Sequence, residues 1–155
     1  MRDMSGVLAV EDSIVACRMV AKLLRQCGVK NVEQVQTGAA ALQRLAAAEF
    51  DAVICDYEMA PMSGLDVLAH GRGGGGLRET PFIMMSGTKD PRWIAETSRL
   101  GADCMLAKPF DAATLQQKMR QLGLASKVAV AVPRNADSGG STASSEADAC
   151  HELDA

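Results

Sequence analysis

The sequence predicts an α/β protein built on a doubly wound parallel sheet of five strands with five helices. Two observations carry this prediction. Short apolar runs alternate five times with segments of helical periodicity between Val7 and Leu122, a pattern typical of parallel sheets with right-handed crossovers. Four of the five apolar runs end on ionisable or hydroxyl side chains, and in a parallel sheet these ends lie along one edge.

Length and composition fit one globular domain, because the chain has 155 residues, 48% hydrophobic and 23% charged. A net charge of -3 argues against a protein whose main affinity is for nucleic acid phosphates. No apolar segment approaches the roughly 20 residues of a membrane span, and the N-terminus lacks the apolar region of a signal peptide. The five cysteines lack C-x-x-C spacing and indicate buried free thiols. We therefore expect a cytoplasmic protein without nucleic acid or membrane partners.

The first half of the chain predicts three strands and two helices. They are a buried strand at 7–10, a helix at 13–27, an edge strand at 31–36, a helix at 38–49 and a central buried strand at 52–56. Asp12 or Ser13 caps the first helix, and Gly28 ends it. The edge position of the second strand follows from Glu33 and Gln34, polar residues that a strand buried on both faces does not favour.

The second half predicts three helices, two strands and a tail. They are a helix from 64 to about 70, a flexible glycine-rich connector at 71–76, a strand at 81–85, a helix at 91–100, a strand at 104–107 and a last helix capped by Asp111. Residues 1–124 are expected to form the folded domain. Small and polar residues dominate 125–155, so a disordered C-terminal tail is expected there. Its apolar segment 128–132 is a loosely held linker or docks on the domain.

The polar residues at the strand ends predict phosphoryl transfer. Glu11, Asp12 and Asp56 follow two apolar strands and should converge. Carboxylates packed together need a neutralising cation, and a hard ion such as Mg2+ suits them. Lys108 and Ser86 end the two other strands and offer a positive charge and a hydroxyl to an anionic group. A carboxylate nucleophile, a metal and a lysine together favour phosphoryl transfer onto Asp56.

Four motifs in this order and spacing resemble the response-regulator receiver domains of the CheY type, over about residues 5–124. They are Val-Leu-Ala-Val-Glu-Asp-Ser at 7–13, Asp-Tyr-Glu-Met-Ala-Pro-Met-Ser-Gly at 56–64, Met-Met-Ser-Gly at 84–87 and Lys-Pro-Phe at 108–110. The resemblance implies a flavodoxin-like fold with strand order 2-1-3-4-5. It also implies a stand-alone regulator of two-component signalling, which is not an enzyme beyond the phosphorylation and dephosphorylation of its own aspartate.

The resemblance further implies a role for each site residue. Asp56 resembles the phosphoacceptor that is served by a sensor histidine kinase or a histidine phosphotransfer protein. Lys108 is expected to contact the phosphoryl oxygens and to precede a cis proline, and the Ser86 hydroxyl is expected to move toward the phosphoryl group. Asp12 and Asp56 resemble direct Mg2+ ligands, with the backbone carbonyl of Glu58 as a third. Glu11 is expected to act through water.

The chain departs from the family pattern at three positions. Glu11 replaces the commoner Asp, and Ala60 takes the usual proline position, with the proline moved to Pro61. Met105 stands in the fifth strand where the family usually has Tyr or Phe, whose rotation reports phosphorylation. The alternative to phosphosignalling is therefore a receiver-fold docking module that works without phosphorylation.

The output is expected to be a protein contact or the passing on of phosphate. The family's common docking face consists of the fourth helix, fifth strand and fifth helix, and Arg92 and Trp93 are candidates for it, although Trp93 fits ordinary packing equally well. The haloacid-dehalogenase phosphatases also phosphorylate an aspartate, in a D-x-D-x-[TV] motif. Glu58 and Ala60 depart from that motif, which argues against this enzyme class.

Overall fold

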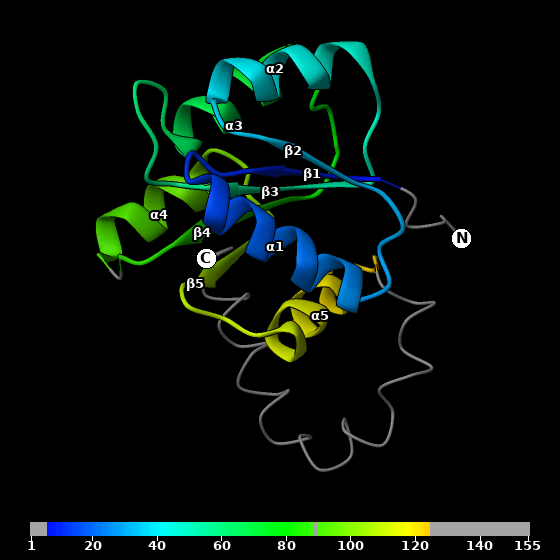
Figure 1. Cartoon of the computed structure of the whole chain (residues 1–155). Coiled ribbons are helices and arrows are strands. Elements are labelled where there is room, and N and C mark those ends of the chain that lie inside the picture. Colours follow the sequence, from blue (N-terminus) through cyan, green and yellow to red (C-terminus); the bar gives the residue numbers. More distant parts are fainter. Residues whose placement is uncertain (1–5, 89, 125–155) are drawn as a thin grey trace.

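The computed structural model describes residues 6–88 and 90–124, which form five strands and five helices in strict alternation (Figure 1). In chain order they are β1 Val7–Val10, α1 Ile14–Gln26, β2 Val32–Val35, α2 Gly38–Ala47, β3 Ala52–Asp56, α3 Gly64–Arg72, β4 Phe82–Ser86, α4 Pro91–Arg99, β5 Cys104–Ala107 and α5 Ala112–Gln121. The predicted number, type and order of elements are confirmed.

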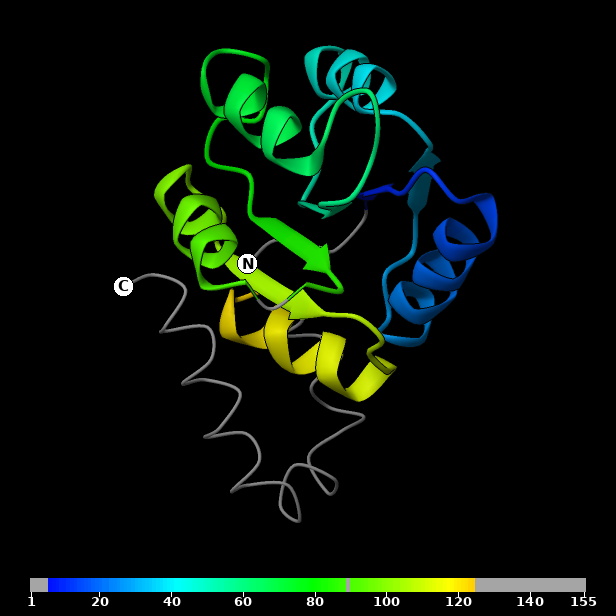
Figure 2. The ribbon, with the colours of Figure 1, turned by 90° about the vertical axis from the view of Figure 1, so that its left-hand side faces the viewer.

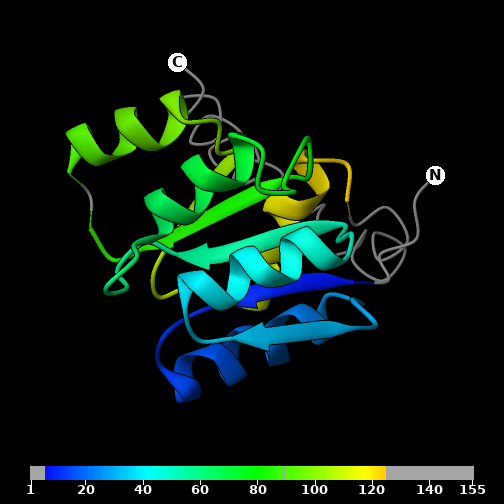
Figure 3. The same cartoon turned by 90° about the horizontal axis from the view of Figure 1, so that it is seen from above.

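The five strands form one parallel sheet in the order β2-β1-β3-β4-β5. The strands point the same way when the molecule is seen from above (Figure 3). The flavodoxin-like order that the family resemblance implied is confirmed, and β2 lies at the edge as its polar residues predicted. All carboxyl ends of the strands therefore meet on the same side of the sheet.

Helices cover both faces of the sheet, which makes the fold doubly wound. Helices α1 and α5 lie side by side on one face, and α2 and α3 lie on the other (Figures 1 and 2). Side chains alternate along β1, so that Val7 and Ala9 enter the core under α1 and α5, whereas Leu8 and Val10 enter the core under α2, α3 and α4. This two-sided burial explains why the central strands read as continuous apolar runs.

The predicted helix boundaries hold to within two residues. At the start of each helix, the side chain of the N-cap residue accepts a hydrogen bond from a backbone amide of the first turn. These N-cap residues are Ser13, Thr37, Ser63, Asp90 and Asp111. Gly28 and Gly101 follow α1 and α4 with φ angles of 94° and 102°, a left-handed conformation that glycine adopts at least cost.

The connector after α3 is more ordered than its glycines suggested. Gly71 and Arg72 belong to the helix and not to the connector, so that part of the prediction is wrong. Gly71 packs tightly on Leu77, which leaves no room for a larger side chain there. The Arg72 guanidinium donates hydrogen bonds to the carbonyls of Gly101, Arg78 and Thr80 and pairs with Asp103. These contacts fix the loops at the amino edge of the sheet, away from the acidic residues.

Cysteine chemistry differs from the expectation at one position. Cys17, Cys27 and Cys55 are buried free thiols, as predicted. Cys104 is disulfide-bonded, so the expectation of a free thiol is wrong for it, and Cys150 lies outside the described residues.

The predicted disorder of the 125–155 tail, including the 128–132 segment, also falls outside the described residues. No helix within 6–88 and 90–124 is long and apolar enough to cross a membrane.

Candidate functional site

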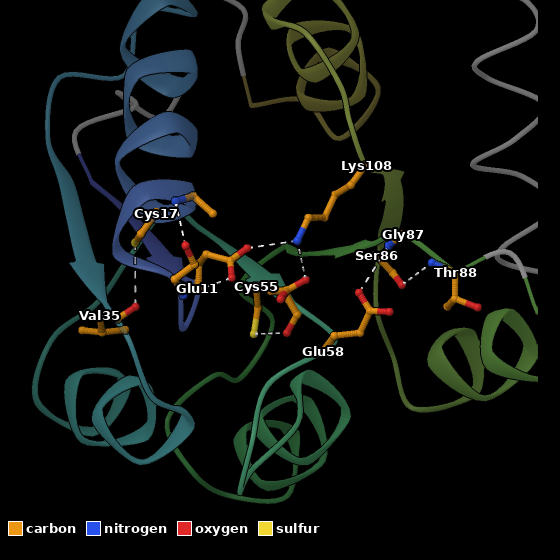
Figure 4. A network of polar contacts seen from close by, with 12 residues as sticks. Glu11, Cys17, Val35, Cys55, Glu58, Ser86, Gly87, Thr88 and Lys108 are labelled. Atoms are coloured by element: carbon orange, nitrogen blue, oxygen red, sulfur yellow. Dashed lines mark hydrogen bonds and ion pairs between the residues drawn. The ribbon is translucent and has the colours of Figure 1, made fainter.

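The polar strand ends come together at the carboxyl edge of the sheet because of its register. Val10 pairs with Cys55, which brings Glu11 and Asp12 beside Asp56. Asp56 pairs with Met85 and Ser86 pairs with Ala107, so Ser86 and Lys108 lie across β4 and β5 from the acids. Figure 4 shows Glu11, Ser86 and Lys108 around one space. All five strand-end residues predicted from the sequence are therefore brought to one place.

Lys108, which follows β5, contacts the ends of β1 and β3, two strands that are not neighbours of β5. Its Nζ atom donates hydrogen bonds of 3.1 Å to Oε2 of Glu11 and 3.1 Å to Oδ1 of Asp56 (Figure 4). Glu11 and Asp56 are 3% and 2% exposed, whereas about a third of the Lys108 side chain, 32%, reaches solvent. The ammonium group offsets part of the cost of burying two carboxylates.

The acid cluster and Lys108 together contain more acidic than basic side chains. Burial raises the pKa of Glu11, and the nearby Asp56 charge raises it further, while the hydrogen bond from Lys108 lowers it. Burial lowers the pKa of Lys108, but its hydrogen bonds to Asp56 and Glu11 and the negative charges of these two acids together outweigh burial, so the net shift of the pKa is upward. Lys108 therefore carries its positive charge at neutral pH, and one cation faces three carboxylates.

The three acids fit a hard divalent cation. Oxygen atoms of Glu11, Asp12 and Asp56 all lie within 4.8 Å of one another. Asp12 is exposed while the other two are buried, so the cluster is open to solvent on the Asp12 side. Mg2+ keeps several waters and binds through one or two carboxylates. This donor set and this opening match that requirement.

The end of β4 supplies hydroxyl and amide groups beside the acids. The Ser86 Oγ atom accepts a 3.0 Å hydrogen bond from the Thr88 amide. The Gly87 amide donates a long hydrogen bond of 3.5 Å to Oε1 of Glu58, whose side chain points toward the end of β4 (Figure 4). The Glu58 carboxylate thus contacts the end of β4 and is not one of the three acids whose oxygens lie within 4.8 Å of one another. Its backbone carbonyl remains the candidate for the predicted metal contact.

The loop after Asp56 is pinned by close packing. A side chain at position 64 would meet the backbone oxygen of Asp56 at 2.5 Å, so the close approach requires glycine. The Gly64 amide also donates to the carbonyl of Tyr57. Among residues 6–88 and 90–124, two peptide bonds are cis, Ala60–Pro61 in this loop and Lys108–Pro109, and the second confirms an expectation from the family resemblance.

One surface next to the acids was not foreseen. Ile14, Val15 and Met19, in the first two turns of α1, are 55%, 76% and 54% exposed. The signal was present in the sequence, because Val15 and Met19 lie off the buried stripe of α1, which contains Cys17, Val20, Ala21 and Leu24. We call these three residues the α1 apolar patch.

Trp93 is a core residue, and the suggestion that it contributes to a docking surface is wrong. Its side chain is only 5% exposed and packs in the core under α4. Arg92 is exposed and pairs with Asp90, so it stays a candidate for a docking face. Met105, on β5, is half-buried against the same core as Trp93.

Known proteins resemble this chain in sequence and in fold. The response regulator receiver domain family matches residues 7–120. The chemotaxis protein CheY-3 of Vibrio cholerae is 33% identical over 116 residues, which are 75% of this chain and 89% of that protein. The crystal structure of Vibrio cholerae CheY4 at low pH is 33% identical, with a TM-score of 0.71, and the match covers 77% of this chain and 98% of CheY4.

A third relative is relevant to the acid cluster because its structure contains a metal ion. The receiver domain of a sensor histidine kinase from Pseudomonas aeruginosa is 26% identical, with a TM-score of 0.68, over 77% of this chain and 98% of that domain. Its structure has a magnesium ion coordinated in the active site cleft. Receiver domains are signalling domains and not classical enzymes. From the family match, the relatives and the shared fold, the chain belongs to the response regulator receiver domain family of two-component signalling.

Proposed function

We propose that this protein is a phosphorelay response regulator that accepts a phosphoryl group from a phosphohistidine donor on Asp56, with Mg2+, and signals by altered protein contacts. The observation that carries the proposal is the position of Asp56. It is a nearly buried carboxylate, 3.1 Å from a lysine ammonium, within an acidic cluster open to solvent. A carboxylate has little structural reason to be buried in this way.

In the proposed transfer, one carboxylate oxygen of Asp56 attacks the phosphorus of the donor. A phosphorus–oxygen bond forms as the phosphorus–nitrogen bond breaks, and the histidine nitrogen keeps the electron pair and takes a proton from solvent. Lys108 is placed to leave Asp56 for the transferred phosphoryl oxygens, and the Ser86 hydroxyl is placed to donate to another of them. Positioning and charge stabilisation supply most of the rate in such transfers.

The proposed Mg2+ site uses the residues that the sequence suggested. Asp12 and Asp56 would bind the ion directly, together with the backbone carbonyl of Glu58, and Glu11 would act through a bound water. The carboxylate oxygens of Glu11, Asp12 and Asp56 lie within 4.8 Å of one another, which supports the three acids of this set. When bound, the ion neutralises negative charge on the carboxylates and on the phosphoryl group.

The proposed donor is a sensor histidine kinase or a histidine phosphotransfer protein that docks over α1. The α1 apolar patch begins two residues after Asp12, so a partner that covers the site must also cover the patch. Exposed Arg18, Lys22 and Arg25 follow on the same helix. A donor surface with apolar residues and an acidic rim would complement this face.

A docking module that works without phosphorylation is the alternative, and Met105 is the observation that favours it. Methionine is flexible but lacks the ring and hydroxyl of the usual residue. The intact acid cluster and Lys108 favour phosphorylation.

The 1–124 domain boundary, cytoplasmic location and absence of nucleic acid partners stay predictions from the sequence.

The proposal is tested by phosphotransfer from a radiolabelled phosphohistidine protein that labels a known receiver domain. We expect Mg2+-dependent label on this chain, lost in Asp56→Asn and retained in the matched control Glu79→Gln, an exposed acid outside the cluster. Borohydride reduction followed by peptide mass analysis should place the acyl phosphate at position 56. Label at another residue, or none with any donor, would favour the docking module.

A further inference from the structure

Tyr57, the residue that follows Asp56, contacts the first turn of α4. Its ring centroid lies 5.0 Å from that of Trp93, and the two ring planes cross at 70°, an edge-to-face arrangement that aromatic pairs favour. The backbone carbonyl of Tyr57 accepts hydrogen bonds from the amides of Met59 and Gly64. Because this backbone is fixed, movement at the contact falls to the two rings and to α4.

A second link joins the site to the same turn of α4. The Thr88 amide donates to Oγ of Ser86 at 3.0 Å, and the Asp90 amide donates to Oγ1 of Thr88 at 3.3 Å. Asp90 is the N-cap of α4 and accepts from the Arg92 amide. The Ser86 hydroxyl at the carboxyl end of β4 is thus connected through two hydrogen bonds to the residue that starts the helix.

Helix α4 carries polar groups that are buried without partners. The Nε1 atom of Trp93 and the Oγ1 atom of Thr97, one turn further along, have no hydrogen-bond partner among the described residues. A buried polar group that lacks a partner destabilises the packing that buries it. This penalty raises the free energy of the present packing of α4. The present packing therefore lies closer in free energy to an arrangement in which these two groups are paired or hydrated. The helix that both links reach is therefore suited to occupy two positions.

The residue that usually reports phosphorylation is absent from β5, because Met105 occupies its place. Met105 packs against the same core as Tyr57 and Trp93. An aromatic pair is therefore present near the missing ring, although it comes from the β3 loop and from α4 and not from β5.

We propose that Tyr57 and Trp93 form the relay by which a phosphoryl group on Asp56 changes the position of α4; this inference rests on the proposed function. When the Ser86 hydroxyl turns to the phosphoryl group, Thr88 loses its acceptor and the Asp90 cap of α4 loosens. Trp93 then repacks against Tyr57, and its indole N–H gains a partner or water. The exposed side of α4, with Arg92, changes its position in the same step.

Tryptophan fluorescence tests this relay directly, because the sequence contains one tryptophan. Wild type, Tyr57→Phe, Tyr57→Leu and Thr88→Val are titrated with beryllofluoride, a non-covalent phosphoryl mimic, in the presence of Mg2+, and Mg2+ alone serves as the blank. We expect a change in Trp93 emission in wild type and in Tyr57→Phe, which keeps the ring. Tyr57→Leu should lose most of the change. Thr88→Val, which removes only the hydroxyl that accepts from the Asp90 amide, should lose it although the mimic still binds.

Hydrogen exchange of residues 91–99 gives a second measurement that does not need Trp93 emission. Exchange in α4 should rise with the mimic in wild type and stay constant in Thr88→Val. Intact mass after acetyl phosphate treatment separates the two proposals. A phosphorylated wild type with unchanged emission and unchanged α4 exchange would overturn the relay and leave the proposed function standing. A protein that takes up no phosphoryl group would overturn both.

Discussion

The ammonium group of Lys108 lies 3.1 Å from the carboxylate of Asp56, although β4 separates the strands that carry them. Lys108 reaches Asp56 across β4 because its long side chain runs over the carboxyl edge of the sheet from the end of β5. The same atom also contacts Glu11. One flexible cation therefore neutralises part of a buried acidic cluster and is free to change partner when another anion arrives.

Removal of this cation should destabilise the protein most when Mg2+ is absent. Lys108→Met leaves two nearly buried carboxylates without a counter-ion. We expect a loss of about 1–3 kcal/mol in the free energy of unfolding, below the usual cost of breaking a buried pair because Lys108 is partly exposed. Urea denaturation with and without Mg2+ measures it, with exposed Lys22→Met as control. A loss that Mg2+ does not reduce would argue against shared charge neutralisation.

Magnesium should stabilise the folded protein through the acid cluster. At a concentration 100 times the dissociation constant, binding adds about 2.7 kcal/mol to the free energy of unfolding. Asp12→Asn should abolish most of this gain, and Glu79→Gln should keep it. Thermal unfolding over a Mg2+ titration measures the effect. Equal stabilisation of all three proteins would show that the ion binds elsewhere.

The sequence predicted the cluster because each member ends an apolar strand. Asp56, Ser86 and Lys108 follow runs that only a buried parallel strand explains, and the order of strands then determines that they meet. The contact between Lys108 and two acids was beyond the sequence, since the reach of a side chain depends on the twist and register of three strands. The sequence also could not decide between a core and a surface position for Trp93, which depends on how α4 rotates over the sheet.

Glycine content was misleading at the end of α3. Gly71 looked like the start of a connector, but it is helical because its missing side chain lets Leu77 approach. Packing against Leu77, a residue of the connection that follows α3, outweighed the entropic cost of glycine there. The exposure of Ile14 was also beyond the sequence. Ile14 shares the helical spacing of the buried residues of α1, but it is the first residue of the helix and remains exposed.

Stability at alkaline pH should depend on Cys27. Burial raises the pKa of this thiol to about 11 from its ordinary value of 9.0. Between pH 9 and pH 11 the unfolded chain loses a proton that the folded protein keeps, so the free energy of unfolding falls as pH rises. The stability advantage of wild type over Cys27→Ala should therefore shrink, by about 1–2 kcal/mol.

Urea denaturation at pH 8 and at pH 10.5 measures this change. Leu24→Ala, a buried truncation on the same helix without a titrating group, is the control, and its stability difference from wild type should not vary with pH. A constant difference between wild type and Cys27→Ala would show that Cys27 titrates normally.

The α1 apolar patch should govern transfer from a protein donor and not the chemistry at Asp56. Met19→Glu places a charge in the patch, and we expect transfer from a phosphorylated histidine protein to slow about tenfold, the equivalent of 1.4 kcal/mol of binding. Labelling by acetyl phosphate should not change, since this small donor needs no docking surface. Gln121→Glu adds the same charge at the far end of α5 and serves as control. Equal rates from the protein donor in both variants would exclude α1 as its docking site.

Intact mass after incubation with acetyl phosphate and Mg2+ tests the central claim most directly, because it needs no partner protein. We expect the wild type to gain one phosphoryl group, and to gain none when EDTA is added or when Asp56 is replaced by Asn. Wild-type protein that gains no mass under conditions that label a known receiver domain, or an Asp56→Asn variant that gains the same mass, would contradict the assignment of Asp56 as the phosphoacceptor.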